Sequence, residues 1–251
     1  MAIFKSGNPA LSEKAFQDSL GASAQGTMTD KGTLNKFFFL SLMVIASASF
    51  TWSAYYQGKD IMSWMMIGAI GGLIVAFVTI FKKEWAPYLT PAYGLLEGFF
   101  LGGISAFINA AYAKAYPGIV MQAVLLTFGT SIGMYGLYRF RIIRATEKFK
   151  AVVFTATAGI AIFYMIAWVL RMFHIDIPFL HEGSAIGIIF SLVVVTIAAL
   201  NLILDFDMIE QGVAMGAPKY MEWYCAFGLL VTIVWLYIEI LKLLMKLADR
   251  R

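Results

Sequence analysis

Seven long apolar stretches constrain this chain more than any other feature of its sequence. They cover residues 37–56, 61–81, 91–112, 119–138, 151–172, 185–204 and 223–244. Each is close to the roughly 20 apolar residues that an α-helix needs to cross a bilayer. Because peptide groups cannot hydrogen bond to lipid, and because no alternating strand pattern is present, these stretches must be helices. The sequence therefore predicts an all-α membrane protein, a seven-transmembrane-helix bundle.

Composition supports a membrane domain and excludes a water-soluble globule. The 251 residues are 61% hydrophobic and only 14% charged, whereas soluble domains are about 25% charged. We expect a cytoplasmic tail over residues 1–36 and one seven-helix transmembrane domain over residues 37–251. In the tail, Asn8 and Pro9 predict the start of a short amphipathic helix, with a solvated tail as the alternative. Pro91 is predicted to open the third transmembrane helix.

The placement of Lys and Arg predicts the orientation in the membrane. The N-terminal tail and the even-numbered loops carry 12 of the 19 basic residues, and the other side carries 7. Since basic residues favour the cytoplasmic side, the N-terminus is predicted to be cytoplasmic. An odd number of crossings then puts the basic C-terminus outside, unless one segment is re-entrant. The net charge of +4 is explained by this topology, so no nucleic-acid partner is expected.

Small residues and an apolar last segment predict how the helices pack. Glycines four residues apart allow close helix approach in lipid, and three such pairs occur: Gly68 with Gly72, Gly98 with Gly102, and Gly129 with Gly133. In the third helix they indicate either a tight interface or a narrow path. The seventh segment is apolar on all sides, which predicts that the last helix is central and buried.

Four acids lie where hydropathy disfavours them. Glu97 is inside the third segment, Glu239 is deep in the seventh, and Asp205 and Asp207 close the sixth. A carboxylate near the centre of a membrane helix costs about 2.5 to 3.5 kcal/mol, so each needs a partner, a proton or a bound cation. For Asp205 and Asp207 a hydrated helix end is the plain alternative.

Two stretches near the C-terminus carry a family resemblance. Residues 198–210, reading AALNLILDFDMIE, and residues 235–241, reading WLYIEIL, resemble the Bax inhibitor family, close to its bacterial YccA-like branch. Further agreement comes from Asn8-Pro9, from Met28-Thr29 with Gly32-Thr33, and from Glu97-Gly98 with Leu101-Gly102. The similarity spans nearly the whole chain.

The resemblance implies six helices around a central last helix and a pH-sensitive calcium leak controlled by two acids. Asp205 matches the first acid, and Glu239 matches the second by its local sequence. The bacterial branch implies the cell inner membrane. Two departures stand out: 34 residues separate Asp205 from Glu239, and residues 61–81 contain no charged residue.

The two acids that the resemblance implies, Asp205 and Glu239, are predicted to lie at different depths in the membrane. With a cytoplasmic N-terminus, Asp205 lies near the cytoplasmic end of its helix, whereas Glu239 lies roughly 24 Å beyond Trp223. Glu97 lies near the depth of Asp205, so it is the geometric candidate for its partner. We predict Asp205, Glu239, Glu97 and Asp207 as pH-sensing or cation-binding residues, with Asp205 and Glu97 as metal ligands. No cofactor is expected, and calcium is the predicted bound or transported ion.

Other classes of function fit the sequence less well. A retinal protein needs a lysine near the middle of its last helix, and Lys242 lies towards the end. An enzyme needs a nucleophile with a base, or metal ligands, and His174 and His181 lie in a loop. The chain is therefore not predicted to be an enzyme. A regulatory scaffold that binds membrane protein partners without transport remains the alternative to a leak that is closed at rest.

Overall fold

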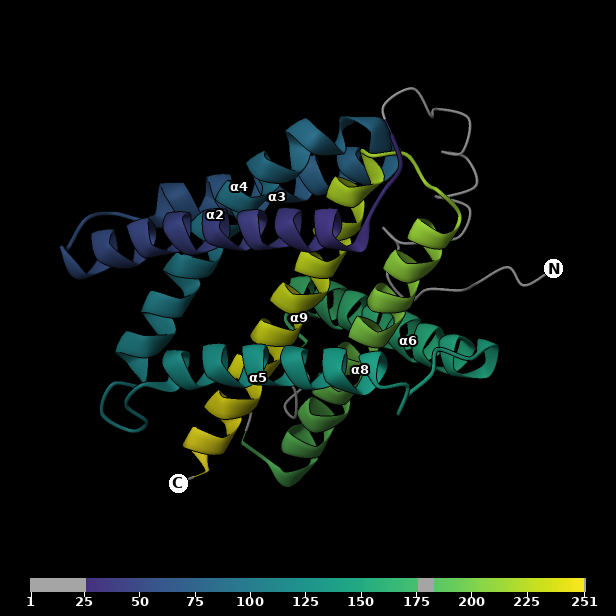
Figure 1. Cartoon of the computed structure of the whole chain (residues 1–251). Coiled ribbons are helices and arrows are strands. Elements are labelled where there is room, and N and C mark those ends of the chain that lie inside the picture. The colour runs from purple at the N-terminus through teal and green to yellow at the C-terminus, as the bar shows by residue number, and fades with distance from the viewer. Residues whose placement is uncertain (1–25, 176–182, 251) are drawn as a thin grey trace. The chain divides into compact units, whose positions relative to one another are not determined.

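The computed structural model describes residues 26–175 and 183–250, and all of its long elements are α-helices. The elements are α2 (Asp30–Tyr56), α3 (Met62–Phe81), the short 3₁₀ helix η2 (Lys83–Trp85), α4 (Ala86–Ala111), α5 (Ile119–Arg139), α6 (Glu147–Met172), α8 (Ala185–Ala214) and α9 (Met221–Asp249) (Figure 1). Seven helices among the described residues are long and apolar enough to cross a membrane. The prediction of seven spans is confirmed, and the chain is a multi-pass protein of a lipid bilayer.

Several helix ends differ from those that hydropathy predicts. Pro91 lies inside α4, so the prediction that it opens the helix is wrong. A proline there removes the hydrogen bond to the carbonyl of Pro87, and its ring crowds the same carbonyl, but the helix continues through it. α8 continues to Ala214, so the prediction that Asp205 and Asp207 close this helix is also wrong. The predicted helix near Asn8 lies outside the described residues.

The first transmembrane helix begins about two turns before its apolar run. α2 starts at Asp30, and the side chain of Thr29 accepts a hydrogen bond from the Gly32 N–H. This is the usual N-cap arrangement, in which a hydroxyl satisfies a backbone donor that has no partner within the helix. The polar residues 30–36 therefore belong to the helix rather than to the tail.

The chain divides into two compact units. The first contains the described residues from 112 to 207 and from 232 to 250, and the second contains residues 26–111 and 208–231. α5 and α6 belong to the first unit, whereas α2, α3 and α4 belong to the second. α8 and α9 each contribute residues to both.

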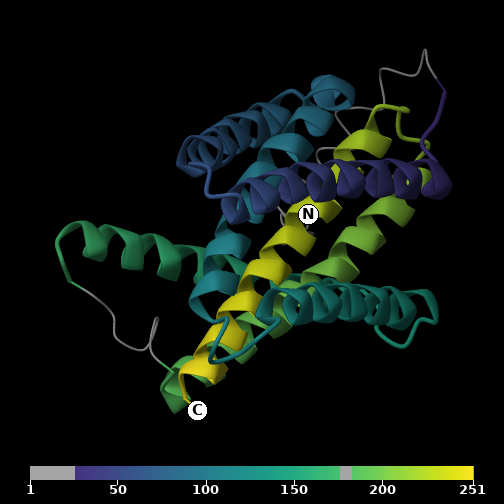
Figure 2. The same cartoon turned by 90° about the vertical axis from the view of Figure 1, so that its left-hand side faces the viewer.

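In the second unit, α2 and α3 both pack against α4 through glycines (Figures 1 and 2). A Cβ atom added at Gly98 would meet the Val44 carbonyl of α2, and one added at Gly102 would meet the Ala48 carbonyl. A Cβ atom added at Gly68 of α3 would lie 2.6 Å from the Leu96 carbonyl oxygen of α4. The small face of α4 is therefore a tight helix interface.

The third glycine pair behaves differently. A Cβ atom added at Gly129 or Gly133 of α5 would meet no described atom within 4 Å. The prediction of close helix packing is therefore wrong for this pair. The spacing is the same as in the other pairs, but within its own unit α5 has no described neighbour in contact with these two positions.

α9 is the most buried of the seven helices. In its most apolar stretch 67% of the residues are buried, against 6% for α6. In the second unit the ring of Phe227 packs edge-on against Tyr93 of α4 at 4.9 Å. The predicted burial of the last helix is confirmed.

Candidate functional site on the polar face of α6

Three polar side chains repeat every seven residues along α6. Lys150, Thr157 and Tyr164 lie about two helical turns apart, which puts them on one face of the helix. Each contacts a polar group of α8 or α9 within the first unit. We call this set the polar face of α6.

Asp207 of α8 pairs with Lys150 at the start of α6. The Nζ of Lys150 lies 2.7 Å from an Asp207 carboxylate oxygen, and both side chains are largely buried, at 5% and 15% exposed. The Tyr138 hydroxyl, from the last turn of α5, donates to the other oxygen at 3.4 Å. The guanidinium of Arg141 lies over the Tyr138 ring. Asp207 is therefore an ion-paired residue inside the unit.

The middle contact of the polar face joins two neutral groups. The Asn201 side-chain amide donates to the Thr157 hydroxyl at 2.8 Å and to the Ile197 carbonyl at 2.8 Å. Asp205 lies one turn beyond Asn201 on α8 and is 0% exposed. Asp205 is thus a buried acid on α8, between the residue that contacts Thr157 and the residue that contacts Lys150.

Glu239 of α9 meets the far end of the same face. The Tyr164 hydroxyl donates to one carboxylate oxygen at 3.0 Å, and the Lys242 ammonium lies 3.0 Å from the other. That ammonium also lies 4.7 Å from the centre of the Tyr164 ring, in cation–π contact. Glu239 is only 2% exposed, so its charge is balanced within the protein.

The polar face separates the acids that the resemblance pairs. Asp207 contacts Lys150, and Glu239 contacts Tyr164, which lies 14 residues later on the same helix. At 1.5 Å per residue this corresponds to roughly 21 Å along α6. Asp205 lies at the Asp207 end, so the structure does not bring Asp205 and Glu239 together.

Glu97 belongs to the second unit, whereas Asp205 belongs to the first. The Tyr93 hydroxyl, one turn earlier on α4, donates a hydrogen bond to Glu97. The carboxylate also faces α3, since a Cβ atom added at Gly72 would lie 3.5 Å from it. Glu97 therefore has a partner on its own helix, and its pairing with Asp205 stays a prediction.

The acids of the described residues lie apart from one another rather than in one cluster. Calcium takes six to eight oxygen ligands, several of them carboxylates. Within residues 26–175 and 183–250, no three acidic, histidine or cysteine side chains come together. Asp207 and Glu239 are instead each paired with a lysine. Each of these two acids therefore has a cationic partner within the protein.

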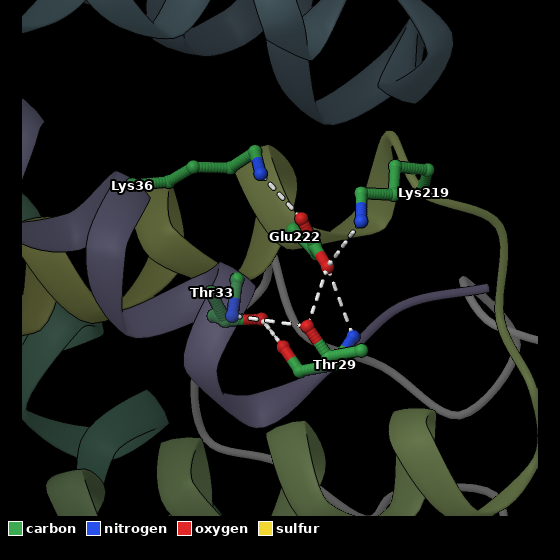
Figure 3. A network of polar contacts seen from close by, with 6 residues as sticks. Thr29, Thr33, Lys36, Lys219 and Glu222 are labelled. Atoms are coloured by element: carbon green, nitrogen blue, oxygen red, sulfur yellow. Dashed lines mark hydrogen bonds and ion pairs between the residues drawn. The ribbon is translucent and has the colours of Figure 1, made fainter. Parts of the chain in front are cut away.

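The structure also shows a buried acid that the sequence analysis did not select, Glu222 in the first turn of α9 (Figure 3). One carboxylate oxygen pairs with the Lys36 ammonium, and the other accepts hydrogen bonds from the Thr29 N–H and hydroxyl, each at 3.0 Å. Lys219 lies 3.6 Å away. The Glu222 side chain is 0% exposed, so this network ties the start of α2 to the start of α9.

Local backbone contacts reinforce the Glu222 network. The Met28 N–H donates to the Ala217 carbonyl at 2.7 Å, and the Lys219 N–H donates to the Gly26 carbonyl at 3.1 Å. A Cβ atom added at Gly32 would collide with the Glu222 carboxylate. The missing side chain of Gly32 therefore leaves room for the Glu222 carboxylate. This explains why a glycine stands three residues after the N-cap residue, Thr29.

The sequence analysis did not identify the lysines that lie buried beside polar groups. It counted Lys36, Lys150 and Lys246 as topological charges, whereas all three are mostly buried inside the protein. Lys246 of α9 donates to the Gly187 carbonyl and to the Ser191 hydroxyl of α8. The one available signal for Glu222 was the Thr29-to-Gly32 stretch, which belongs to the resemblance and forms the cradle around this acid.

The comparisons with known proteins concern the whole chain. Searches of curated proteins and of solved structures gave no match. A protein-family model described as Bax inhibitor 1 like matches residues 8–249. This range includes every described helix, the polar face of α6 and the Glu222 network. The seven-span protein therefore belongs to the Bax inhibitor 1 like family.

Proposed function

We propose that the protein is a pH-sensitive cation leak of the cell inner membrane, closed at rest, with calcium as its cargo. The observation that carries this proposal is the polar face of α6, on which Asp207 and Glu239 are held by polar partners at two depths. Membrane-embedded acids and hydroxyls are costly unless they are paired, and they mark ion and proton pathways. The basic residues favour a cytoplasmic N-terminus.

The ion pairs support the proposal of a closed resting state. The carboxylate of Asp207 attracts the ammonium of Lys150, and this contact holds α6 against α8. Tyr138 also faces Asp207, and Arg141 lies behind Tyr138. With the pair intact, each polar side chain of this face is in contact with a polar group of α8 or α9.

Acidification acts on the same pairs. A proton on the Asp207 carboxylate would remove the charge that attracts Lys150 and would weaken the contact between α6 and α8. Separation would free the oxygens of Thr157 and Asn201, close to Asp205. These are the hard oxygen ligands that a calcium ion prefers. Glu239 is held in a similar way, and the groups that face it are Tyr164, Lys242 and Lys246.

The test is calcium flux into proteoliposomes as a function of pH. Asp207→Asn imitates the protonated acid, so we expect flux at neutral pH to rise about tenfold, since a hydrogen bond to a charged group contributes about 1.5 kcal/mol or more. The calcium flux of this variant should also depend less on pH than that of the unaltered protein. Glu239→Gln should shift the profile in the same direction.

The matched control is Glu147→Gln, which removes an exposed carboxylate 3.8 Å from the same lysine. It should leave the flux profile unchanged. If Asp207→Asn, Glu239→Gln and the unaltered protein all share one pH profile, the acids are not the gate. If no preparation carries calcium at any pH, the regulatory scaffold that acts through protein partners becomes the better account.

A further inference from the structure

The loop between α5 and α6, together with the adjoining ends of both helices, carries a concentration of positive charge. Across residues 139–148 the chain has four basic side chains and one acid, Glu147, and all five are exposed. The basic residues are Arg139, Arg141, Arg144 and Lys148. We call residues 139–148 the basic loop.

Large apolar side chains alternate with these charges. Phe140 is 79% exposed and Ile142 is 70% exposed. They lie directly beside arginines, beyond the end of the α5 span. An exposed ring next to cationic groups suits the boundary between lipid headgroups and acyl chains, where one part of the surface is polar and the other apolar.

The backbone of the basic loop is held in one arrangement. The Ile142 N–H donates to the Leu137 carbonyl at 3.0 Å, and the Thr146 N–H donates to the Arg144 carbonyl at 2.8 Å. Arg141 has φ +58°, a left-handed conformation that favours glycine. Its guanidinium stacks on Tyr138, whose hydroxyl bonds to Asp207. The loop is thus physically connected to the polar face of α6.

We propose that the basic loop docks the headgroups of anionic phospholipids in the cytoplasmic leaflet. The phosphates pair with Arg139, Arg144 and Lys148, while Phe140 and Ile142 enter the apolar layer beneath them. Charge complementarity selects this partner, because a cluster of basic residues next to a transmembrane helix attracts anionic lipid. The predicted topology puts this loop on the cytoplasmic side. Lipid docking does not depend on cation transport.

The experiment measures lipids retained by the purified full-length protein after exchange into mixed detergent micelles of phosphatidylglycerol and phosphatidylcholine. Native mass spectrometry gives the number of phosphatidylglycerol and phosphatidylcholine molecules that remain bound to each protein. The unaltered protein should prefer phosphatidylglycerol. The triple variant Arg139→Gln, Arg144→Gln and Lys148→Gln should lose about tenfold of that preference, because each basic residue near an anionic surface contributes appreciably.

A second triple variant removes the same number of charges from the predicted outer side: Lys59→Gln, Lys114→Gln and Arg171→Gln. It should keep the preference. Equal loss in both triple variants, or no preference in the unaltered protein, would overturn the proposal. Inorganic phosphate should not displace the lipid from the unaltered protein, and Phe140→Ser should weaken retention. Displacement by phosphate would show a simple anion site and would contradict lipid docking.

Discussion

Replacing Gly102 by leucine should prevent stable packing of α2 against α4. The new side chain would meet the Ala48 carbonyl and the Thr51 hydroxyl, and a helix backbone cannot move aside as a flexible side chain can. Overpacking costs about 1 to 3 kcal/mol and more where no relaxation is available, so we expect a loss of about 3 kcal/mol. The midpoint of thermal unfolding in detergent should fall accordingly, and the yield of monodisperse protein should drop.

Gly129→Leu is the matched control. It makes the same change inside a helix at a position where an added Cβ atom meets no described atom. Leucine has the better helix propensity by nearly 1 kcal/mol, so this variant should be as stable as the unaltered protein or slightly more stable. Equal destabilisation at both positions would contradict the account of α4 as the glycine-lined centre of its unit.

Replacing Glu222 by alanine should destabilise the second unit by about 3 kcal/mol, since removal of one partner from a buried pair leaves the other charge uncompensated. Lys36 would lose its partner, and the Thr29 N–H would lose its acceptor. For a chain of this length, the loss corresponds to a fall of roughly 10 °C in the unfolding midpoint. Differential scanning fluorimetry in detergent measures it.

Two further variants test whether the stabilisation comes from the specific contacts of Glu222 with Lys36 and Thr29 or from any nearby charge. Lys219 is half exposed and lies 3.6 Å from Glu222, so Lys219→Gln should cost less than about 0.5 kcal/mol. Glu222→Gln keeps an oxygen that can accept from Thr29 and should recover part of the loss. A Lys219→Gln variant as unstable as Glu222→Ala would show that the network is not centred on Lys36 and Thr29.

Hydropathy predicted the seven spans because apolar length alone decides which stretches can cross lipid. It failed at the helix ends where polar residues continue a helix. α8 extends past Asp205 and Asp207 because a buried acid with a partner such as Lys150 no longer opposes helix formation there. A sequence window cannot register a partner more than fifty residues away.

In the candidate site, too, some residues could be predicted from the sequence and others could not. The acids stood out because each interrupts an apolar stretch, so Glu239 and Asp207 could be selected from the sequence. Their partners did not stand out, since lysines at helix ends are expected in any membrane protein. Glu222 was missed because it lies at a segment boundary, where an acid needs no explanation. Tertiary contacts alone reveal that it is fully buried.

The exchange of Asp207 and Lys150 tests whether the ion pair between them keeps the cation leak closed. Calcium flux at neutral pH is measured for Asp207→Lys, for Lys150→Asp and for the double variant that carries both changes. Each single variant puts like charges together, so it should leak, and the double variant should restore an ion pair and a closed state. A double variant that leaks as much as the sum of the two single variants, or single variants that stay closed, would contradict gating by this pair.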